Sequence, residues 1–411
     1  MPSHNSDAYQ ILADRLAARG IDVADVEARL KRQEIETPSW GYADSGTRFG
    51  VFPQAGAAVT IFEKIEDAVQ VHRHTGIAPL VATHVLWDLP DAAAVRDVPA
   101  CAKEHGVRIG SINPNVFQDR EYWFGSITNR DPAVRRKAVQ HMLDSIEIGK
   151  ALGSTVLSLW FADGTDYPGQ ADFRQRKAWM EESLREVYAA MPPQMRMLVE
   201  YKPFEPGLYH TDLADWGMSC LVCRKCGERA QVLVDLGHHL PGTNIEHIVA
   251  ALLDERLLGG FHFNNRKYAD DDLMVGSVNP YEFFLIYHEL VKEELEPRGN
   301  PPIAFMVDQG FNTKKKISGM IQTVCMIQAT YAKALIVDRK ALADAQAEND
   351  VVAAEQTLLE AFQTDGEPLL RKVRREMGVP EDPLRAYLAS GYQERIERER
   401  GIRTGAGGLG Q

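Results

Sequence analysis

Side chains that bind divalent cations gather around His262. It is followed within a few residues by Asp270, Asp271 and Asp272. Residues 259–263 alternate small and aromatic types as a short buried strand does, which places His262 near the strand's C-terminal end. In an extended loop, residues two apart point the same way, so Asp270 and Asp272 would face one ion and Asp271 would face elsewhere. Imidazole and carboxylate ligands without a thiolate suit Mn, Mg, Co or Zn. The alternative is that these residues form an ordinary acidic loop in contact with solvent, which would have the same composition.

The order of elements along the chain predicts how these side chains are positioned. Residues 7–34 have the apolar spacing of two amphipathic helices. From residue 36 onward, eight short β-like runs alternate with helical stretches, one of which is opened by Asp131 and Pro132 and covers 131–152. The eight runs are 37–41, 80–84, 107–113, 155–160, 197–202, 232–238, 259–264 and 303–309. This alternation predicts a closed (β/α)8 TIM barrel of the α/β class.

Four parts of the chain follow from this assignment. They are N-terminal helices (1–35), the catalytic barrel (36–337), a C-terminal helical extension (338–400) and a glycine-rich disordered tail (401–411).

The composition narrows the possible partners. The 411 residues include 58 acidic and 46 basic side chains, a net charge of −12, which works against binding nucleic acid or an anionic membrane surface. There is no apolar run of about 18 residues, and the first residues lack the pattern of a signal peptide. The five cysteines are an odd number and suggest a reducing compartment. We therefore expect a soluble, cytoplasmic protein.

Barrel enzymes carry their chemistry at the C-terminal ends of the strands. Four consecutive strand ends supply Glu200, Asp235, His262 and Asp308. Three carboxylates in a partly desolvated site need a cation, so one divalent ion would take these four ligands. Glu200 could bridge to a second ion, whose remaining ligands would be His238, Asp270 and Asp272.

A pair of divalent ions and the residues around it suit a polyol substrate. Two ions can bind two neighbouring oxygens, lower the pKa of a hydroxyl and polarise a carbonyl. Lys202 lies two residues beyond Glu200 and would place a positive donor beside a developing oxyanion. Trp87 and Trp160 follow strand ends, where they could stack on a sugar or shield a deoxy methyl group. The alternative is that these tryptophans only plug the top of the barrel.

Several runs together resemble L-rhamnose isomerase, the bacterial type with a broad aldose range. The resemblance covers about residues 8 to 393. It is carried by Pro38-Ser39-Trp40-Gly41, Thr47-Arg48-Phe49, Val234-Asp235-Leu236-Gly237-His238-His239, Gly260-Phe261-His262-Phe263-Asn264, Lys267-Tyr268 with Asp270-Asp271-Asp272-Leu273, and Val307-Asp308-Gln309.

The resemblance implies roles for these residues. A structural metal would lie on Glu200, Asp235, His262 and Asp308, and a catalytic metal on His238, Asp270 and Asp272. Lys202 would contact the O1 side of the substrate, His84, Trp87 and Trp160 would line the sugar site, and Phe49 would reach into a neighbouring subunit. The family is tetrameric, binds two divalent ions per subunit (Mn preferred, Co or Zn possible), and isomerises L-rhamnose to L-rhamnulose and related aldoses such as D-allose.

The chain departs from the family pattern at two places. Asn265 and Arg266 stand where Asp-Ser is expected, and Phe311 stands where a histidine is expected. Both departures put the preferred sugar in doubt.

Other functions fit parts of the sequence. They are a different sugar isomerase of the xylose isomerase-like barrel group, a phosphodiesterase of the endonuclease IV kind, which the negative charge disfavours, and an inactive sugar-binding barrel. Cys220, Cys223 and Cys226 have a cluster-like spacing but lack a fourth ligand and lie in a helical stretch, so we expect no metal there.

Two expectations concern mechanism and assembly. Lys202, His238, Asp270 and Asp308 are the predicted catalytic residues. Because every acid at the strand ends is committed to a metal, a hydride shift between C1 and C2 is favoured over an enediol route, for which Asp308 would be the first candidate base. Phe49 and Phe52 on the polar loop 44–52 predict a contact surface and a homotetramer.

Overall fold

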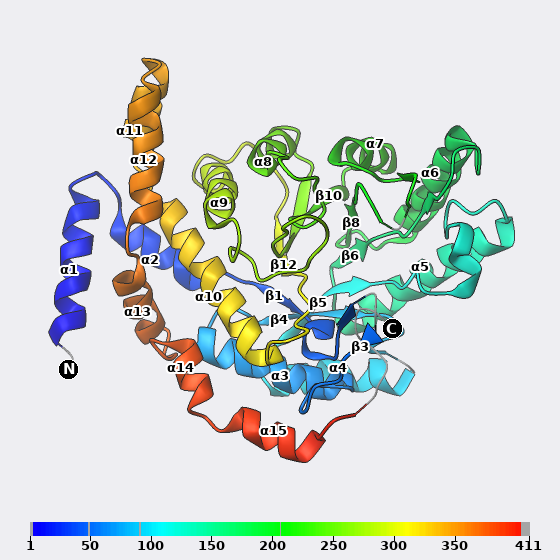
Figure 1. Cartoon of the computed structure of the whole chain (residues 1–411), viewed down its shortest axis with the longest axis horizontal. Coiled ribbons are helices and arrows are strands. Elements are labelled where there is room, and N and C mark those ends of the chain that lie inside the picture. Colours follow the sequence, from blue (N-terminus) through cyan, green and yellow to red (C-terminus); the bar gives the residue numbers. More distant parts are fainter. Residues whose placement is uncertain (1–2, 48–49, 90–91, 206, 404–411) are drawn as a thin grey trace.

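Eight parallel strands close into a barrel in this computed structural model, which describes residues 3–47, 50–89, 92–205 and 207–403. The expected fold class is confirmed, and Figure 1 shows the barrel within its ring of helices. The barrel strands are β1 (Glu36–Pro38), β4 (Leu80–His84), β5 (Arg108–Asn113), β6 (Val156–Leu159), β8 (Arg196–Glu200), β10 (Ala230–Asp235), β11 (Leu258–Phe263) and β12 (Ala304–Val307). Strand β12 pairs with β1 and closes the ring.

Eight helices alternate with these strands. They are α3 (Ile61–Thr75), α4 (Ala92–Glu104), α5 (Pro132–Leu152), α6 (Phe173–Ala190), α7 (Trp216–Cys226), α8 (Ile245–Asp254), α9 (Pro280–Leu295) and α10 (Lys316–Leu335). Helix α5 has the predicted start, with Asp131 as N-cap accepting a hydrogen bond from the Ala133 N–H at 2.8 Å. It ends at Gly153, whose φ of 77° requires the left-handed conformation that glycine adopts readily.

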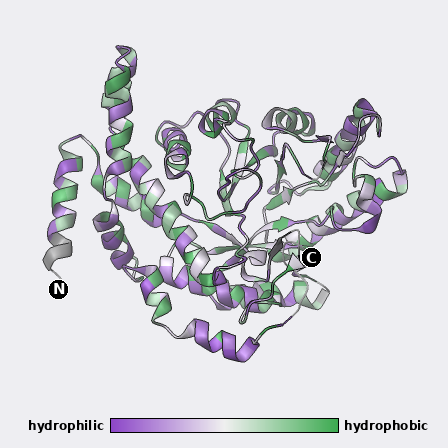
Figure 2. Ribbon diagram, in the orientation of Figure 1, coloured by the Kyte–Doolittle hydropathy of each residue, from purple (hydrophilic) through white to green (hydrophobic). Residues whose placement is uncertain are grey.

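Further helices lie outside the ring. At the N-terminus these are α1 (Ser3–Ala17) and α2 (Val23–Arg32), and beyond α10 they are α11 (Arg339–Ala347), α12 (Val351–Gln363), α13 (Glu367–Glu376), α14 (Pro383–Leu388) and α15 (Tyr392–Arg400). Figure 1 shows α11 and α12 side by side, projecting from the body of the protein. Figure 2 shows α15 as largely hydrophilic, and Arg400 at its end holds it to α3 through Asp67 at 2.8 Å.

Short elements lie in the loops at the C-terminal face of the barrel. They are the 3-10 helices η1 (Ser39–Tyr42) and η2 (Arg120–Phe124), and the antiparallel pairs β2 (Gly46–Thr47) with β3 (Gly50–Val51) and β7 (Gly164–Thr165) with β9 (His210–Thr211). Phe49 lies outside the described residues, and so does most of the predicted tail at 401–411.

Several predicted strands are too long at their C-terminal ends. Lys202 and His238 were placed within strands, but β8 ends at Glu200 and β10 at Asp235. The chain turns after Asp235 because the Asp235 carboxylate accepts the Gly237 N–H at 2.7 Å and its carbonyl accepts the His238 N–H at 3.2 Å. Both residues therefore reach the barrel mouth from loops.

The barrel interior below the mouth is largely apolar but holds the buried Glu36, whose carboxylate accepts the Ser111 N–H at 3.0 Å. Val156, Leu198, Leu233 and Met306 form a small buried cluster inside the ring, while a larger core fills the space between strands and helices. Within the described residues no single helix is long and apolar enough to cross a membrane, and α10 with α11 would qualify only as a pair bent by 58°.

Candidate active site

Three predicted carboxylate ligands lie around one nitrogen of the fourth predicted ligand, the His262 imidazole. The parallel register sets Asp235 beside His262, and Asp308 follows directly after β12. His262 Nδ1 lies 3.2 Å from Glu200 Oε1, 3.8 Å from Asp235 Oδ2 and 3.7 Å from Asp308 Oδ2. One ligand atom from each of Asp235, His262 and Asp308 lies within 4.8 Å of the other two. This first set therefore has the spacing of a metal site.

A second set adjoins the first at Glu200. His238 Nδ1 lies 3.2 Å from Glu200 Oε1 and donates to the Tyr201 carbonyl at 3.0 Å, while its Nε2 lies 3.4 Å from Asp270 Oδ2. A carbonyl partner on one ring nitrogen fixes the imidazole orientation and leaves the other for a ligand. Glu200 Oε1 thus lies 3.2 Å from a ring nitrogen of each histidine, and ligand atoms of Glu200, Asp235 and His238 also lie within 4.8 Å of one another.

A small hairpin carries Asp270 and Asp272 over the barrel mouth. Asn265 and Leu273 pair in antiparallel fashion, with N–H to carbonyl distances of 2.8 and 2.9 Å. Asp271 turns away and accepts the Lys267 N–H at 2.6 Å, so it closes the loop, as its position between the two ligands predicts. Asp272 has a φ of 44°, a left-handed conformation that Asp tolerates better than most residues.

The electrostatics of the cluster reflect its surplus of carboxylates. Burial raises the pKa of Asp235 to about 7. Burial would lower the pKa of His262, but the neighbouring Glu200 charge outweighs it and raises this pKa to about 9. Burial and the Asp270 charge hold the pKa of Asp272 well above its usual range. Protons are thus drawn into a site where mutual repulsion of carboxylates would otherwise be severe.

The donor set fits divalent cations. Asp270 Oδ1 and Asn264 Oδ1 are buried without a hydrogen-bond partner, although buried acceptors normally have one. Asn264 donates to both Asp235 oxygens, at 2.9 and 3.0 Å, and so orients that carboxylate. Hard oxygens with imidazole and no thiolate suit Mn, Co, Zn or Mg. The cysteines at 220, 223 and 226 are on α7 and do not line the cavity described below. Burial raises the pKa of the Cys223 thiol above its usual range.

Lys202 connects the second ligand set to the cavity. Its ammonium is buried, lies 2.8 Å from Asp270 Oδ2, and sits 5.3 Å from the centre of the Trp160 ring. Burial works against the charge, but Asp270 outweighs it and raises the Lys202 pKa. Lys202 is therefore a fixed cationic donor beside the predicted second cation.

Aromatic rings form the opposite wall. His84 stacks on Trp87 with ring centres 3.7 Å apart, and Phe117 meets Trp160 edge to face at 4.8 Å. The Trp40 indole N–H donates to Asp308 Oδ1 at 2.8 Å and so ties this wall to the first ligand set. A stacked aromatic wall facing polar groups suits a molecule with one apolar side and several hydroxyls.

His84 is held as a neutral acceptor. Burial lowers its pKa to about 3. Its Nδ1 donates to the Val85 carbonyl at 3.0 Å, which leaves the Nε2 lone pair for a hydroxyl. Asp88 fixes the backbone here, because it accepts the His84 N–H at 2.7 Å and pairs with the buried Lys64 at 2.6 Å.

A cavity of about 340 Å³ brings both walls together. It is lined by Trp40, His84, Trp87, Asn113, Pro114, Phe117, Gln118, Ser158, Trp160, Glu200, Lys202, Glu205, His238, His262, Asp270, Asp272 and Asp308. The predicted site residues account for ten of these, and the seven that were not among them are Trp40, Asn113, Pro114, Phe117, Gln118, Ser158 and Glu205. Gln118 accepts the Trp87 indole N–H at 2.8 Å, a contact between two loops that residue spacing does not reveal.

The two departures from the family pattern do not line this cavity. Arg266 is buried and points into the loop after β10, where it donates to the His239 carbonyl at 3.0 Å. Asn265 Oδ1 accepts the Val278 N–H at 2.7 Å and so braces the hairpin. Phe311 packs under α10 against Gly319. Neither departure therefore contacts the cavity directly, and their effect on the preferred sugar stays a prediction.

The chain is a TIM barrel with a cluster of imidazole and carboxylate groups at the C-terminal ends of its strands, where a metal ion could bind. Residues 67–290 match the family model described as "Xylose isomerase-like TIM barrel". A protein named "Probable sugar isomerase" of Rhizobium meliloti (strain 1021) is 43% identical over 97% of this chain and 94% of its own length. A second one, of Mesorhizobium japonicum, is 40% identical over the same shares. This chain therefore belongs to the xylose isomerase-like TIM barrel family.

A solved structure supports the fold alone. A D-psicose 3-epimerase crystallised in the presence of D-fructose superposes with a TM-score of 0.52 at 13% identity, covering 75% of this chain and 98% of that one.

Proposed function

We propose that this protein is a metal-dependent aldose-ketose isomerase that converts L-rhamnose to L-rhamnulose and accepts related aldoses such as D-allose. The observation that carries the proposal is the pair of ligand sets that meet at Glu200, 3.2 Å from each of His238 and His262, opposite an aromatic wall. The two relatives named as probable sugar isomerases support the reaction class.

Two divalent cations fit the ligand sets. Glu200, Asp235, His262 and Asp308 would hold one, and His238, Asp270 and Asp272 with Glu200 would hold the other. When bound, such ions acidify a hydroxyl and polarise a carbonyl.

The chain's own residues bind and orient the sugar in this proposal. Lys202 donates to the oxygen on C1 and stabilises negative charge that develops there. His84 Nε2 accepts a hydrogen bond from a sugar hydroxyl. Trp87 and Trp160 cover the apolar side of the sugar, which favours a 6-deoxy methyl group and excludes water from the reacting carbons.

The hydride route remains our proposal for hydrogen transfer. The only lining carboxylate outside the two ligand sets, among the described residues, is Glu205, 3.6 Å from Lys202 and mostly exposed. A carboxylate paired with an ammonium and open to water is poorly suited to hold the C2 proton away from solvent. Asp308 is occupied by Trp40 and by the first ligand set.

A homotetramer is the proposed assembly. Phe52 is 56% exposed on the loop that carries Phe49. Other large apolar side chains are exposed on loops around the mouth of the barrel, namely Leu86, Trp123, Phe124, Tyr167, Leu208 and Tyr268. Apolar residues gathered around one face are typical of a contact surface.

A ketose-formation assay tests the function. Metal-stripped protein with added Mn²⁺ should form ketose from L-rhamnose faster than from hexoses that carry a 6-hydroxyl. No ketose from any aldose after Mn²⁺ addition contradicts the reaction class, and a preference for ordinary hexoses contradicts the assignment of rhamnose.

A further inference from the structure

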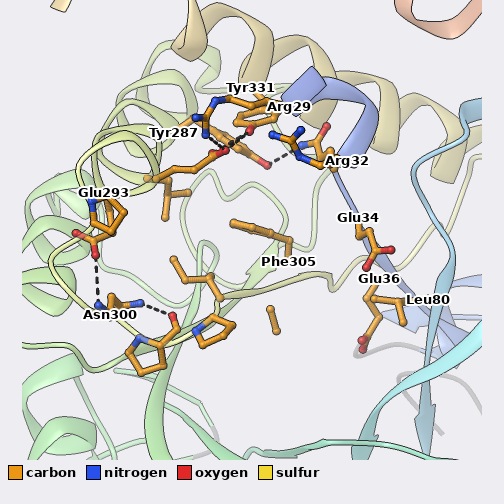
Figure 3. Close-up of a pocket in the computed structure, with 18 residues that line it drawn as sticks. Arg29, Arg32, Glu34, Glu36, Leu80, Tyr287, Glu293, Asn300, Phe305 and Tyr331 are labelled. Carbon is orange, nitrogen blue, oxygen red and sulfur yellow. Dashed lines mark hydrogen bonds and ion pairs between the residues drawn. The ribbon is translucent and has the colours of Figure 1, made fainter. Parts of the chain in front are cut away.

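A second cavity lies at the opposite end of the barrel. It measures about 480 Å³ and is formed by α2, α9, α10 and the N-terminal ends of β1, β4 and β12 (Figure 3). We call it the floor cavity. No residue lines both this cavity and the active-site cavity, although both are bounded by some of the same strands.

The walls of the floor cavity are mainly apolar and aromatic. The Tyr287 and Phe305 rings stack with centres 6.4 Å apart, and Tyr331 lies 5.7 Å from Tyr287. Leu290 and Ile303 complete this side. Figure 3 shows Phe305 in the middle of the cavity, with Tyr287 and Tyr331 on the side of α9 and α10. Flat rings of this kind bind the C–H faces of sugars as well as aromatic ligands.

The charged groups at the cavity include more carboxylates than guanidinium groups, and each carboxylate has a partner. Arg29 pairs with Glu294 at 2.5 Å, and Glu34 pairs with Arg108 at 2.5 Å. Glu293 accepts the backbone N–H groups of Arg298 and Asn300. Glu36, the remaining carboxylate of the lining, is buried and accepts the Ser111 N–H at 3.0 Å. The lining therefore repels anions, and among the described residues none of its carboxylates is left without a partner to bind a cation, which favours a neutral ligand.

Three hydrogen-bonding groups at the cavity remain available. Gln33 Oε1 is buried and has no hydrogen-bond partner. The Tyr287 hydroxyl accepts a hydrogen bond from Gln33 Nε2 at 3.4 Å, and no acceptor for its own proton lies among the described residues. Arg32 is exposed at the rim, with no ion pair to any residue that the structure describes. The ligand must therefore supply at least one donor, for Gln33, and at least one acceptor, for Tyr287.

We propose that the floor cavity binds a neutral polyhydroxy compound of about the size of a monosaccharide. Hydroxyl groups donate and accept, so the same ligand satisfies Gln33 Oε1, the Tyr287 hydroxyl and the Arg32 guanidinium. Its C–H face lies against Phe305. The site is independent of the proposed isomerase reaction, because none of the predicted metal ligands contributes to it.

Equilibrium dialysis of the Mn²⁺-loaded protein with radiolabelled D-glucitol tests the proposal, because a polyol without a carbonyl group cannot be isomerised. Ile303→Trp fills the floor cavity and should reduce the D-glucitol bound per chain by one equivalent. Any D-glucitol bound in the active-site cavity should be unaffected. Leu221→Trp is the matched control, because it makes the same enlargement at an exposed position on α7, and it should bind as the unchanged protein does. Melting curves of both variants verify folding.

Gln33→Leu supplies a second variant of similar size. It removes the unpaired acceptor and should weaken binding of that equivalent roughly tenfold or more, as expected for a lost hydrogen bond. The proposal is overturned if Ile303→Trp binds as many equivalents as the Leu221→Trp control. It is also overturned if benzoate, tested in parallel as an aromatic anion, occupies the floor cavity and D-glucitol does not.

Discussion

Gly237→Ala should weaken metal binding although Gly237 itself offers no ligand atom. A Cβ at this position would lie 3.0 Å from Asn264 Oδ1, 3.0 Å from Asp270 Oδ1 and 3.1 Å from Asp235 Oδ1. Ordinary contacts of this kind are 3.4 to 4 Å, so the three oxygens must move by a few tenths of an ångström. Metal ligand distances tolerate changes of only about 0.2 Å.

The expected loss of Mn²⁺ affinity is roughly 10- to 100-fold, the range found when groups that support metal ligands are removed. This corresponds to about 1.4 to 2.8 kcal/mol of binding free energy. Isothermal titration of the metal-stripped protein with Mn²⁺ measures it, with ketose formation at saturating Mn²⁺ as a second readout.

Gly366→Ala is the control, because a Cβ there meets no atom within 4 Å and its φ of −86° suits alanine. Its Mn²⁺ affinity should be unchanged. If Gly237→Ala also binds Mn²⁺ with unchanged affinity, Asp235 and Asp270 do not hold cations in the arrangement described here.

Four further outcomes are expected. Removal of the cations with a chelator should lower the melting temperature, and Asp235→Ala should abolish this dependence; an identical melting curve before and after chelation would argue against the first metal site. Lys202→Met should keep Mn²⁺ bound but reduce turnover roughly a hundredfold or more, and turnover at the level of the unchanged protein would exclude Lys202 from the reaction. In deuterated water the ketose should carry almost no deuterium at C1, and Glu205→Gln should turn over at a similar rate; deuterium at C1 would instead require a base, with Asp308 and Glu205 as candidates. Light scattering should give the mass of a tetramer, which Phe52→Asp should dissociate; a fully active monomer would refute the proposed assembly.

Most of the eight strands were predictable because they are short and mainly apolar, as Val156–Leu159 and Ala304–Val307 are, which is expected for parallel strands covered on both faces. Strands β1 and β5 are more polar and were placed by their positions in the strand-helix alternation. The strand ends were less predictable. His238 was assigned to a strand because the sequence 232–238 gives no strong turn signal except Gly237, and the turn there depends on the Asp235 side chain. Asp270 and Asp272 line the cavity and Asp271 does not, as predicted, but the loop is not extended there as the prediction assumed, because Asp272 is left-handed.

The loop residues of the cavity were not predictable from spacing. Gln118 and Glu205 enter the cavity because long loops fold back over the mouth, and nothing in the local sequence fixes that return. The position of Arg266 was not predictable from spacing either. It lies next to the hairpin that carries Asp270 and Asp272, but its guanidinium donates to the backbone carbonyls of Leu236, His239 and Leu240 in the loop after β10 and does not enter the cavity.

The positions of the predicted ligands along the chain have a consequence for biosynthesis. All seven lie between Glu200 and Asp308, and β12 must emerge from the ribosome before it can pair with β1. Because domains begin to fold from the N-terminus during translation, almost half of this chain is made before the first ligand exists. A nascent chain that stops before β12 thus already carries six of the seven predicted ligands on an open sheet, and the first ligand set is complete only when Asp308 has been added.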